Sequence, residues 1–325
     1  MSRPDPDYRG PLATEMRAFV DAKRALGRRF LTEEKQLRLL DAFLAHKRIR
    51  SAEDVSPATM DAFLASRARA RARSHNELLG VARRFFDWLV QQGRLSRSPV
   101  RSRRRRATGQ RLPFLFGPDE VVRLLKLTEE MADRPRAPLR GPTYTLIFAL
   151  LYGLGLRVGE VSRLRRRDVD LDRQLLVIRD TKFGKSRLVP FGPRIGKRIQ
   201  AYLRLRGDLH PDAAIFSFTR RGTVHPGTIS QTFRQLLPKL ALVIPPGVTS
   251  PRVHDLRHAF AVGTLLRWYR EGIDPSARLF HLSTFLGHVN PSSTAVYLNI
   301  TTELLVSANQ RFEAFAASTV KAVAR

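Results

Sequence analysis

A strongly basic stretch with almost no large apolar residues interrupts the chain about a third of the way along. Residues 96–111 carry Pro99, Gly109 and a run of arginines, and Val100 is their one large apolar residue. A segment with this composition cannot contribute to a hydrophobic core, so we predict a linker over residues 97–111. The chain is therefore expected to fold as two units joined by a basic connection.

The part before the linker has the apolar spacing of helices. Large apolar residues recur at three- and four-residue intervals, and Ser56-Pro57 is suited to the N-cap and first turn of a helix. Gly93 is placed to stop the last helix. We predict a flexible N-terminal tail over residues 1–11 and a helical unit over residues 12–96.

The part after the linker, residues 112–325, adds a hairpin to a helical pattern. Leu175–Arg179 and Arg187–Pro190 are rich in Leu, Val and Ile and read as two antiparallel strands. Helices are predicted at about 118–131, 142–154, 194–207, 226–241, 255–270, 278–287, 291–298 and 301–319. The predicted fold class is mainly α with a small antiparallel β-sheet.

Charge indicates the class of partner. Lys and Arg number 58 against 29 Asp and Glu, a formal net charge of +29, and only 9 of the 58 are lysines. Because guanidinium groups grip phosphates with paired hydrogen bonds, nucleic acid is the favoured partner over a membrane surface or an acidic protein. The chain has no cysteine, which excludes disulfides, thiol catalysis and Cys-ligated zinc. With no bilayer-length apolar stretch and no secretory signal, a soluble cytoplasmic protein is expected.

Several short motifs have an ordinary reading when each is taken alone. The glycines of residues 153–159 are spaced G-x-G-x-x-x-G after a helix, which is unlike a dinucleotide loop and typical of a helix stop followed by a turn. Arg157 and Glu160 are suited to an ion pair at the start of the next helix. His254 and Arg257 are also three residues apart, and a lone tyrosine such as Tyr297 is usually a core residue.

Taken in order, these positions resemble the tyrosine recombinase (phage integrase) family. The resemblance rests on residues 152–160, 181–190 and 254–260, and on Leu286-Gly287-His288 followed by Tyr297. It covers essentially the whole second unit, and the first unit looks like the family's helical core-binding domain. The implied architecture is a two-domain C-clamp, in which a SAM-like core-binding domain is joined to an α+β catalytic domain.

The resemblance also implies roles for individual residues. Tyr297 is the expected nucleophile, which forms a 3′-phosphotyrosyl link, and no metal or other cofactor is expected. The other implied residues are Arg157 and Arg257 as the phosphate clamp, Lys182 as the general acid, His254 as the proton acceptor or relay, His288 as a phosphate hydrogen-bonder and Glu160 as a supporting residue. Lys185 is the alternative to Lys182; the spacing from Arg187 favours Lys182 and leaves Lys185 to contact DNA.

Two further groups of arginines are predicted to bind DNA. One precedes the last helix of the first unit and the other lies in the linker: Arg67, Arg69, Arg71, Arg73, Arg103, Arg104, Arg105 and Arg106. The linker group acts either as a phosphate-binding strap or as a solvated hinge. For the first group, an exposed loop with no DNA contact is the alternative.

The family resemblance carries expectations about biology as well. Double-stranded DNA is the expected partner, bound by a homotetramer or by a hetero-oligomer with sister recombinases, in the cytoplasm and at the nucleoid. The 31 residues from Arg257 to His288 exceed the spacing of compact Xer-type members. The sequences of residues 265–272 and 282–288 look more like those of transposon-borne recombinases, including those encoded in trios. Two alternatives stay open: a catalytically silent accessory homologue and a type IB topoisomerase. The C-terminal helix packs either on its own unit or on a neighbouring protomer.

Overall fold

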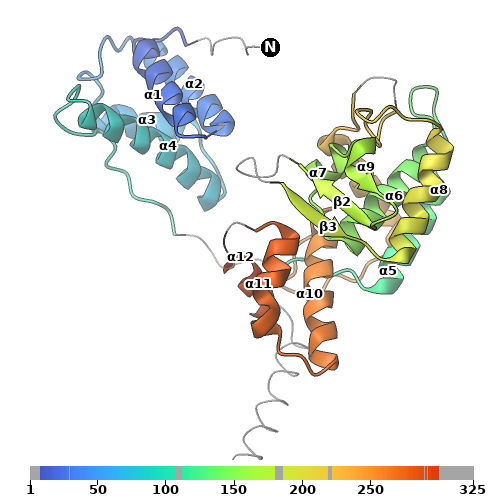
Figure 1. Cartoon of the computed structure of the whole chain (residues 1–325). Helices are drawn as coiled ribbons and strands as arrows, with labels where there is room; N and C mark the ends of the chain where they lie inside the picture. The colour runs from blue at the N-terminus through green and yellow to red at the C-terminus, as the bar shows by residue number, and fades with distance from the viewer. Residues whose placement is uncertain are drawn as a thin grey trace, which may run out of the picture. The chain divides into compact units, whose positions relative to one another are not determined.

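The computed structural model describes residues 8–28, 30–106, 112–179, 186–218, 222–288, 290 and 292–299. Two compact units divide the chain between Gln110 and Arg111 (Figure 1). Each has a hydrophobic core of its own, as expected for separately folded domains.

The first unit is a bundle of four helices, α1 (Ala13–Ala25), α2 (Leu31–His46), α3 (Pro57–Ser66) and α4 (Ala72–Gln91). Their apolar faces meet in a core that contains the fully buried rings of Phe19, Phe63 and Phe85. The predicted start of α3 is confirmed, because the Ser56 hydroxyl accepts a hydrogen bond from the Thr59 backbone N–H at 3.1 Å and Pro57 occupies the first turn.

From Tyr8 onward the N-terminal segment packs against the first unit. Tyr8 is buried, and the Arg9 and Gly10 backbone N–H groups donate to the Asp41 carboxylate on α2 at 2.9 and 3.0 Å. The prediction of a flexible tail over residues 1–11 is therefore wrong from Tyr8 onward. A buried carboxylate needs hydrogen-bond donors, and these backbone groups supply them.

The basic segment is held along the first unit up to Arg106. Asn76 on α4 accepts from the Arg105 backbone N–H and donates to its carbonyl, both at 2.8 Å. The Arg83 guanidinium donates to the Ser102 carbonyl, and the Ser102 hydroxyl donates to Asp61. Residues 101–106 thus run along α3 and α4 as a hydrogen-bonded strip.

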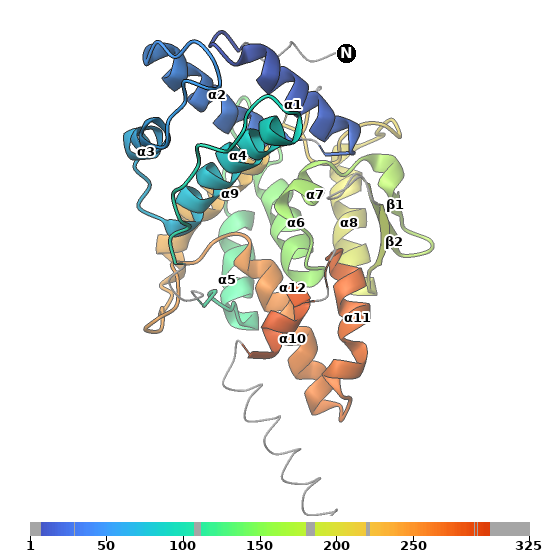
Figure 2. The same ribbon diagram turned by 90° about the vertical axis from the view of Figure 1, so that its left-hand side faces the viewer.

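The second unit is mostly helical, with α6 in its interior and a small sheet at one side (Figure 2). Ten of the fourteen residues of α6 are buried, which agrees with its nearly continuous apolar sequence. The elements are α5 (Pro118–Glu129), α6 (Arg140–Gly153), α7 (Val158–Ser162), η1 (Arg166–Asp168), β1 (Val169–Asp170), β2 (Leu175–Ile178), β3 (Arg187–Pro190), α8 (Pro193–Arg206), α9 (Pro226–Leu236), η3 (Leu237–Leu240), α10 (Asp255–Arg270), α11 (Pro275–Leu286), α12 (Ser292–Ala295) and η4 (Val296–Asn299).

The sheet has three antiparallel strands in the order β1-β2-β3. The predicted hairpin is present, with Ile178 opposite Arg187 and Leu175 opposite Pro190, and the two-residue strand β1 is an addition that the sequence did not suggest. The predicted class, mainly α with a small antiparallel sheet, is confirmed. The predicted helix over 301–319 lies outside the described residues. Among the described helices, none has the length and apolar character to cross a bilayer.

Helices α10, α11 and α12 gather below β3 in Figure 1 and form a smaller core beside the main one. Val262 and Leu265 of α10 pack there with Leu282 and Leu286 of α11, and Tyr297 of η4 completes the cluster. Tyr297 thereby packs between α10, which carries Arg257, and α11, whose end precedes His288.

Candidate active site

Three arginines from different elements meet at the C-terminal end of α11. Arg187 of β3 donates from Nε to the Phe285 carbonyl at 2.8 Å. Arg257 of α10 and Arg157, just before α7, donate to the two carbonyls that follow, those of Leu286 at 2.6 Å and Gly287 at 2.7 Å. The last carbonyls of a helix have no partner within the helix and lie at its negative end, so they are natural acceptors for cations.

Two glycines shape the backbone on which these arginines rest. Gly287 ends α11 at φ +67°, and a Cβ there would lie 2.8 Å from the Arg187 guanidinium. Gly155 turns the chain at φ +57° and offers its carbonyl to Arg257, and a Cβ there would lie 2.5 Å from the Phe260 ring. Both positions combine a left-handed backbone with crowding that only glycine tolerates.

Glu160 joins two of the arginines. Its carboxylate accepts from the Arg157 guanidinium at 2.8 Å and from both terminal nitrogens of Arg187 at 2.9 Å. Burial alone would raise the pKa of this carboxyl, but hydrogen bonds and charge from Arg187, with help from Arg157, lower it to about 2. Glu160 is therefore ionised at neutral pH and holds both guanidinium groups in fixed orientation.

Arg257 is buried without a carboxylate among its hydrogen-bond partners. Only 1% of its surface is exposed, and its guanidinium donates to the carbonyls of Gly155 and Leu286. Burial and the nearby positive charge of Arg157 lower its pKa to about 9, so it remains protonated at pH 7. Among the residues that the structure describes, three guanidinium groups and one carboxylate meet here, which leaves a local excess of two positive charges.

The nucleophile candidate, Tyr297, lies against α10. It is 3% exposed, and its Oη is 2.8 Å from Nδ1 of His258. Burial raises the pKa of its phenol, while Arg257 and Arg157 act in the opposite direction. The hydroxyl is therefore protonated in this state and forms a hydrogen bond with an imidazole.

Three histidines around the tyrosine are uncharged at neutral pH. Burial, together with Arg257 and Arg157, lowers the pKa of His288 to about 4, and its Nδ1 is 2.7 Å from the Thr294 hydroxyl. Burial, together with Arg252 and Arg257, lowers the pKa of His258 to about 4. His254 packs edge-on against His258, with ring centroids 4.7 Å apart. Part of its surface is exposed, but burial of the ring, together with His258 and Arg257, lowers its pKa as well.

The structure brings most of the predicted catalytic set into one region. Arg157, Glu160 and Arg257 are linked at the end of α11. His288 follows that end directly and Tyr297 comes nine residues later, with the two rings stacked at a centroid distance of 6.4 Å. The predicted Arg157–Glu160 ion pair is confirmed. Lys182 and Lys185 lie outside the described residues.

Sequence reasoning missed two members of this region, Arg187 and His258. Alternation along β3 was an available signal for Arg187, because this residue shares a strand face with the buried Val189. For His258 the signal was its four-residue spacing from His254, which places both imidazoles on one face of α10.

The arginines predicted to bind DNA all lie on the first unit. Arg67, Arg71, Arg103, Arg104 and Arg106 are exposed. Arg73 pairs with Glu77 at 3.1 Å, and Arg105 donates to the Arg69 carbonyl at 2.9 Å, so the two predicted groups touch each other.

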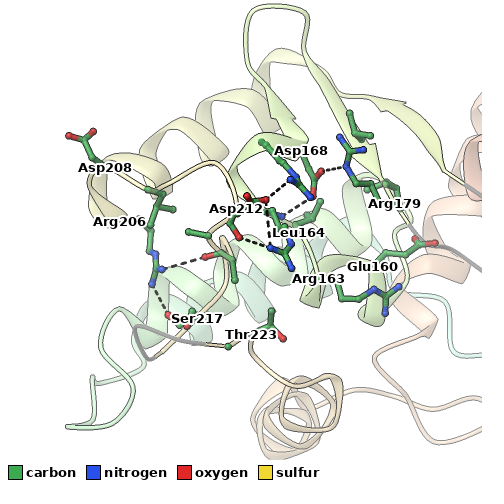
Figure 3. A pocket seen from close by; sticks show the side chains of 18 residues that line it. Glu160, Arg163, Leu164, Asp168, Arg179, Arg206, Asp208, Asp212, Ser217 and Thr223 are labelled. Carbon is green, nitrogen blue, oxygen red and sulfur yellow. Dashed lines mark hydrogen bonds and ion pairs between the residues drawn. The ribbon is translucent and has the colours of Figure 1, made fainter. Parts of the chain in front are cut away.

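A cavity of about 820 Å³ opens on the other side of Glu160, beside α7 (Figure 3). Several arginines line it, and they form ion pairs with aspartates or donate hydrogen bonds to backbone carbonyls. Arg179 pairs with Asp168 at 2.7 Å, Arg167 pairs with Asp212, and Arg206 donates to the Ser217 carbonyl at 2.6 Å.

Comparison with known proteins agrees with the fold. Residues 116–303 match the model of the phage integrase family, and residues 32–93 match the family's N-terminal SAM-like domain. A Sinorhizobium fredii protein named as an integrase/recombinase, y4rB, is 34% identical over 312 residues, which cover 91% of this chain and 95% of that protein. The tyrosine recombinase XerC of Pelobacter propionicus is 30% identical over 306 residues, covering 91% and 94%.

Solved structures share the fold at lower sequence identity. The integrase of transposon Tn1549, in complex with transposon right end DNA, superposes with a TM-score of 0.65 at 16% identity, over 93% of this chain and 98% of that one. A λ integrase dimer bound to a core site gives 0.63 at 18% identity, over 87% and 96%. With the family model covering more than half of the sequence and relatives aligned over nine-tenths of it, the chain belongs to the phage integrase family of tyrosine recombinases, enzymes that cleave and rejoin DNA.

Proposed function

We propose that the arginine cluster binds the scissile phosphate of a DNA duplex and that Tyr297 attacks its phosphorus. The observation that carries this assignment is the excess of two positive charges at the end of α11, on the side where Tyr297 and His288 lie. We assign the clamp to Arg157 and Arg257. Arg187 gives both terminal nitrogens to Glu160, whereas Arg157 gives that carboxylate one and keeps 30% of its side chain exposed. A phosphodiester supplies the negative charge that the cluster lacks.

The proposed reaction gives each of the candidate residues one role. Attack by the phenolic oxygen forms a 3′-phosphotyrosyl bond and expels the 5′ oxygen, so the energy of the broken bond is kept for rejoining. Guanidinium groups that are already oriented stabilise the extra charge on the nonbridging oxygens as the pentavalent transition state forms. We assign the proton for the 5′ oxygen to Lys182, and proton acceptance or relay to His254. His288, whose Nδ1 is held by Thr294, donates to the phosphate from Nε2.

The first unit supplies a second contact with the duplex. Arg103, Arg104 and Arg106 are exposed on a segment that hydrogen bonds fix along α3 and α4, and Arg67 and Arg71 lie exposed in the neighbouring connection between these helices. A fixed row of guanidinium groups suits the regular spacing of backbone phosphates. We propose that this strip and the catalytic unit hold the DNA between them as a clamp, with Lys185 as a further phosphate contact.

We further propose that the recombinase works as an oligomer on DNA carried by a mobile element. The named relatives include an integrase/recombinase, and the structural neighbours include a transposon integrase on DNA and a λ integrase tetramer bound to a Holliday junction. A tetramer of identical subunits, or one shared with sister recombinases, would place four such sites on two duplexes in the cytoplasm, at the nucleoid.

A suicide substrate tests the chemistry. A duplex that carries the recombination site and is nicked close to the scissile phosphate loses a short strand after cleavage, which traps the covalent intermediate. The wild-type protein should form an adduct that survives denaturing electrophoresis, in chelator as well as in magnesium, and Tyr297→Phe should bind the duplex and form none. An adduct with Tyr297→Phe would refute the nucleophile assignment.

The same preparation separates the alternatives. A type IB topoisomerase would relax a supercoiled plasmid that has no specific site, whereas a recombinase requires its site for efficient cleavage. A silent accessory homologue would bind the site and form no adduct under any condition.

A further inference from the structure

His258 occupies a position that the catalytic roles assigned above leave unused. It follows Arg257 on α10, it is half-buried, and its Nδ1 is 2.8 Å from Oη of Tyr297. The two ring centroids are 5.5 Å apart, and the planes are tilted by 58°. This is the distance of a hydrogen bond to the atom that would attack phosphorus, and it joins two residues 39 positions apart in the chain.

We propose that His258 is a catalytic residue that takes the proton from Tyr297 as the phenolic oxygen attacks, and returns it when the DNA strand is rejoined. This inference rests on the proposed function of Tyr297 as the nucleophile. It places an acceptor in direct contact with the reacting oxygen, and it leaves to His254, whose ring packs against that of His258, the relay of the proton and not its first acceptance.

The surroundings of His258 favour the neutral ring that this role needs. Arg252 precedes α10, Arg257 is its neighbour on the helix, and His254 lies one turn earlier with its ring against that of His258. His288 and Arg157 face the same space from the end of α11 and the start of α7. Partial burial and the positive charges of Arg252 and Arg257 keep the imidazole uncharged at neutral pH.

Nδ1 is the ring nitrogen that faces the phenol, and we assign it the role of acceptor. When the ring proton is on Nε2, Nδ1 has a free lone pair directed at the phenol, and the hydroxyl of Tyr297 donates to it. Because the phenol has a raised pKa, the proton stays on Tyr297 until the new bond begins to form. A phosphate bound beside the ring adds negative charge, which favours the imidazolium and so assists the transfer.

In cleavage, proton transfer accompanies the exchange of bonds at phosphorus. The Tyr297 O–H bond breaks and its proton moves to His258 Nδ1, while the oxygen electron pair forms the bond to phosphorus. The bond from phosphorus to the 5′ oxygen breaks, and that oxygen keeps the electron pair and receives a proton from the general acid. In rejoining, the 5′ hydroxyl attacks the phosphotyrosine, and His258 returns its proton to the departing phenolate.

Two substitutions separate proton transfer from positioning. His258→Asn places an amide oxygen near the position of Nδ1, so it preserves an acceptor for the hydroxyl but takes up no proton. His258→Ala removes both functions. His281→Asn, at an exposed histidine on α11, is the matched control and should leave the rate of cleavage unchanged. Circular dichroism and binding to the site check that each variant is folded.

The rate of adduct formation is measured in single turnover on the suicide substrate between pH 6 and pH 9. We expect His258→Asn to be about 100-fold slower at pH 7, the lower end of what a general base contributes. Its rate should rise tenfold per pH unit because solvent must then remove the proton, whereas the wild-type rate stays nearly level. Equal rates, or a slow variant with a level profile like that of the wild type, would overturn the proposal.

A second substrate identifies the side of the reaction on which His258 acts. Replacing the bridging 5′ oxygen by sulfur gives a leaving group that needs no proton, so it should restore cleavage to Lys182→Ala and leave His258→Asn slow. Restoration of His258→Asn by sulfur would place His258 on the leaving-group side and refute the assignment.

A measurement without DNA keeps this proposal separate from the nucleophile assignment. In protein labelled with ¹⁵N-histidine, the Nδ1 resonance of His258 should have the shift of an unprotonated acceptor from pH 6 to pH 8, and it should move in Tyr297→Phe. A protonated Nδ1 refutes the role of His258 whatever the adduct assay shows. An absent wild-type adduct with the expected Nδ1 signal instead refutes the proposed function.

Discussion

Replacing Glu160 with glutamine should destabilise the catalytic unit by an amount that depends on pH in a defined way. The change keeps the shape of the side chain and removes the charge that Arg157 and Arg187 share. The pKa of this carboxyl falls from its ordinary value of 4.5 to about 2, which corresponds to about 3 kcal/mol of stability that is present only while Glu160 is ionised. Only 4% of the residue is exposed, so solvent screens this interaction little.

The sign of the pH dependence follows from the lowered pKa. The stabilisation is complete well above pH 4.5 and is lost as the pH falls toward 2, because protons then bind the unfolded chain before the folded one. At pH 3 somewhat less than half of it should remain. The difference between wild type and Glu160→Gln should therefore shrink from about 3 kcal/mol at pH 7 to about half that value at pH 3.

Urea unfolding followed by tryptophan fluorescence measures this difference. The chain has two tryptophans, Trp88 in the first unit and Trp268 on α10, so a Trp88→Phe background makes the signal report the catalytic unit alone. Glu129→Gln removes a carboxylate from an exposed pair 4.0 Å from Arg198 and should change stability by less than about 0.5 kcal/mol. A loss below about 1 kcal/mol for Glu160→Gln, or the same loss at both pH values, would refute the reasoning.

Three further outcomes test other parts of the structure. Gly287→Ala should lower the free energy of unfolding in urea by about 1–3 kcal/mol and slow adduct formation, because it adds backbone strain and displaces Arg187. The control Gly93→Ala lies at a helix end with φ +68° and open space around it, so it should show the strain alone and leave cleavage unchanged. Replacing Arg103, Arg104 and Arg106 with glutamine should flatten the plot of log affinity against log salt by up to about 0.9 per lost phosphate contact and keep the preference for the specific site, and an unchanged slope in filter binding would show that the strip does not contact DNA. Deleting residues 312–325 should preserve binding to one half-site in a mobility-shift assay and abolish cooperative assembly and recombination, whereas normal recombination by the truncated protein would exclude the C-terminal segment as the link between protomers.

The helices could be predicted from sequence wherever a cap or an apolar period marked them. Ser56-Pro57 gives the start of α3, and the strand propensities of residues 175–190 give the hairpin. Helix α11 starts at Pro275, three residues before the predicted start. Asp274 caps this start by accepting a hydrogen bond from the Ser276 backbone N–H at 2.9 Å. That Asp-Pro pair is a helix-start signal that the sequence reading placed in a connection.

The arginine cluster is harder to predict because backbone atoms build much of it. The carbonyls of Phe285, Leu286 and Gly287 are available only because α11 ends where it does, and no side-chain motif announces an acceptor of this kind. Arg187 and His258 were missed for a related reason. Their partners, Glu160 and Tyr297, are distant in sequence, so only the folded chain shows that they meet.

The end of α11 also restricts how the length of this region can vary between related proteins. Adding or removing a residue near Leu286 would rotate the last turn by about 100° and turn all three acceptor carbonyls away from their guanidinium groups together. Extra residues at the other end, around the turn between α10 and α11, change none of these contacts. The 31-residue interval from Arg257 to His288 can therefore tolerate insertions near Gly272 and none near Gly287, which makes the C-terminal turn of α11 a fixed reference point for aligning distant relatives.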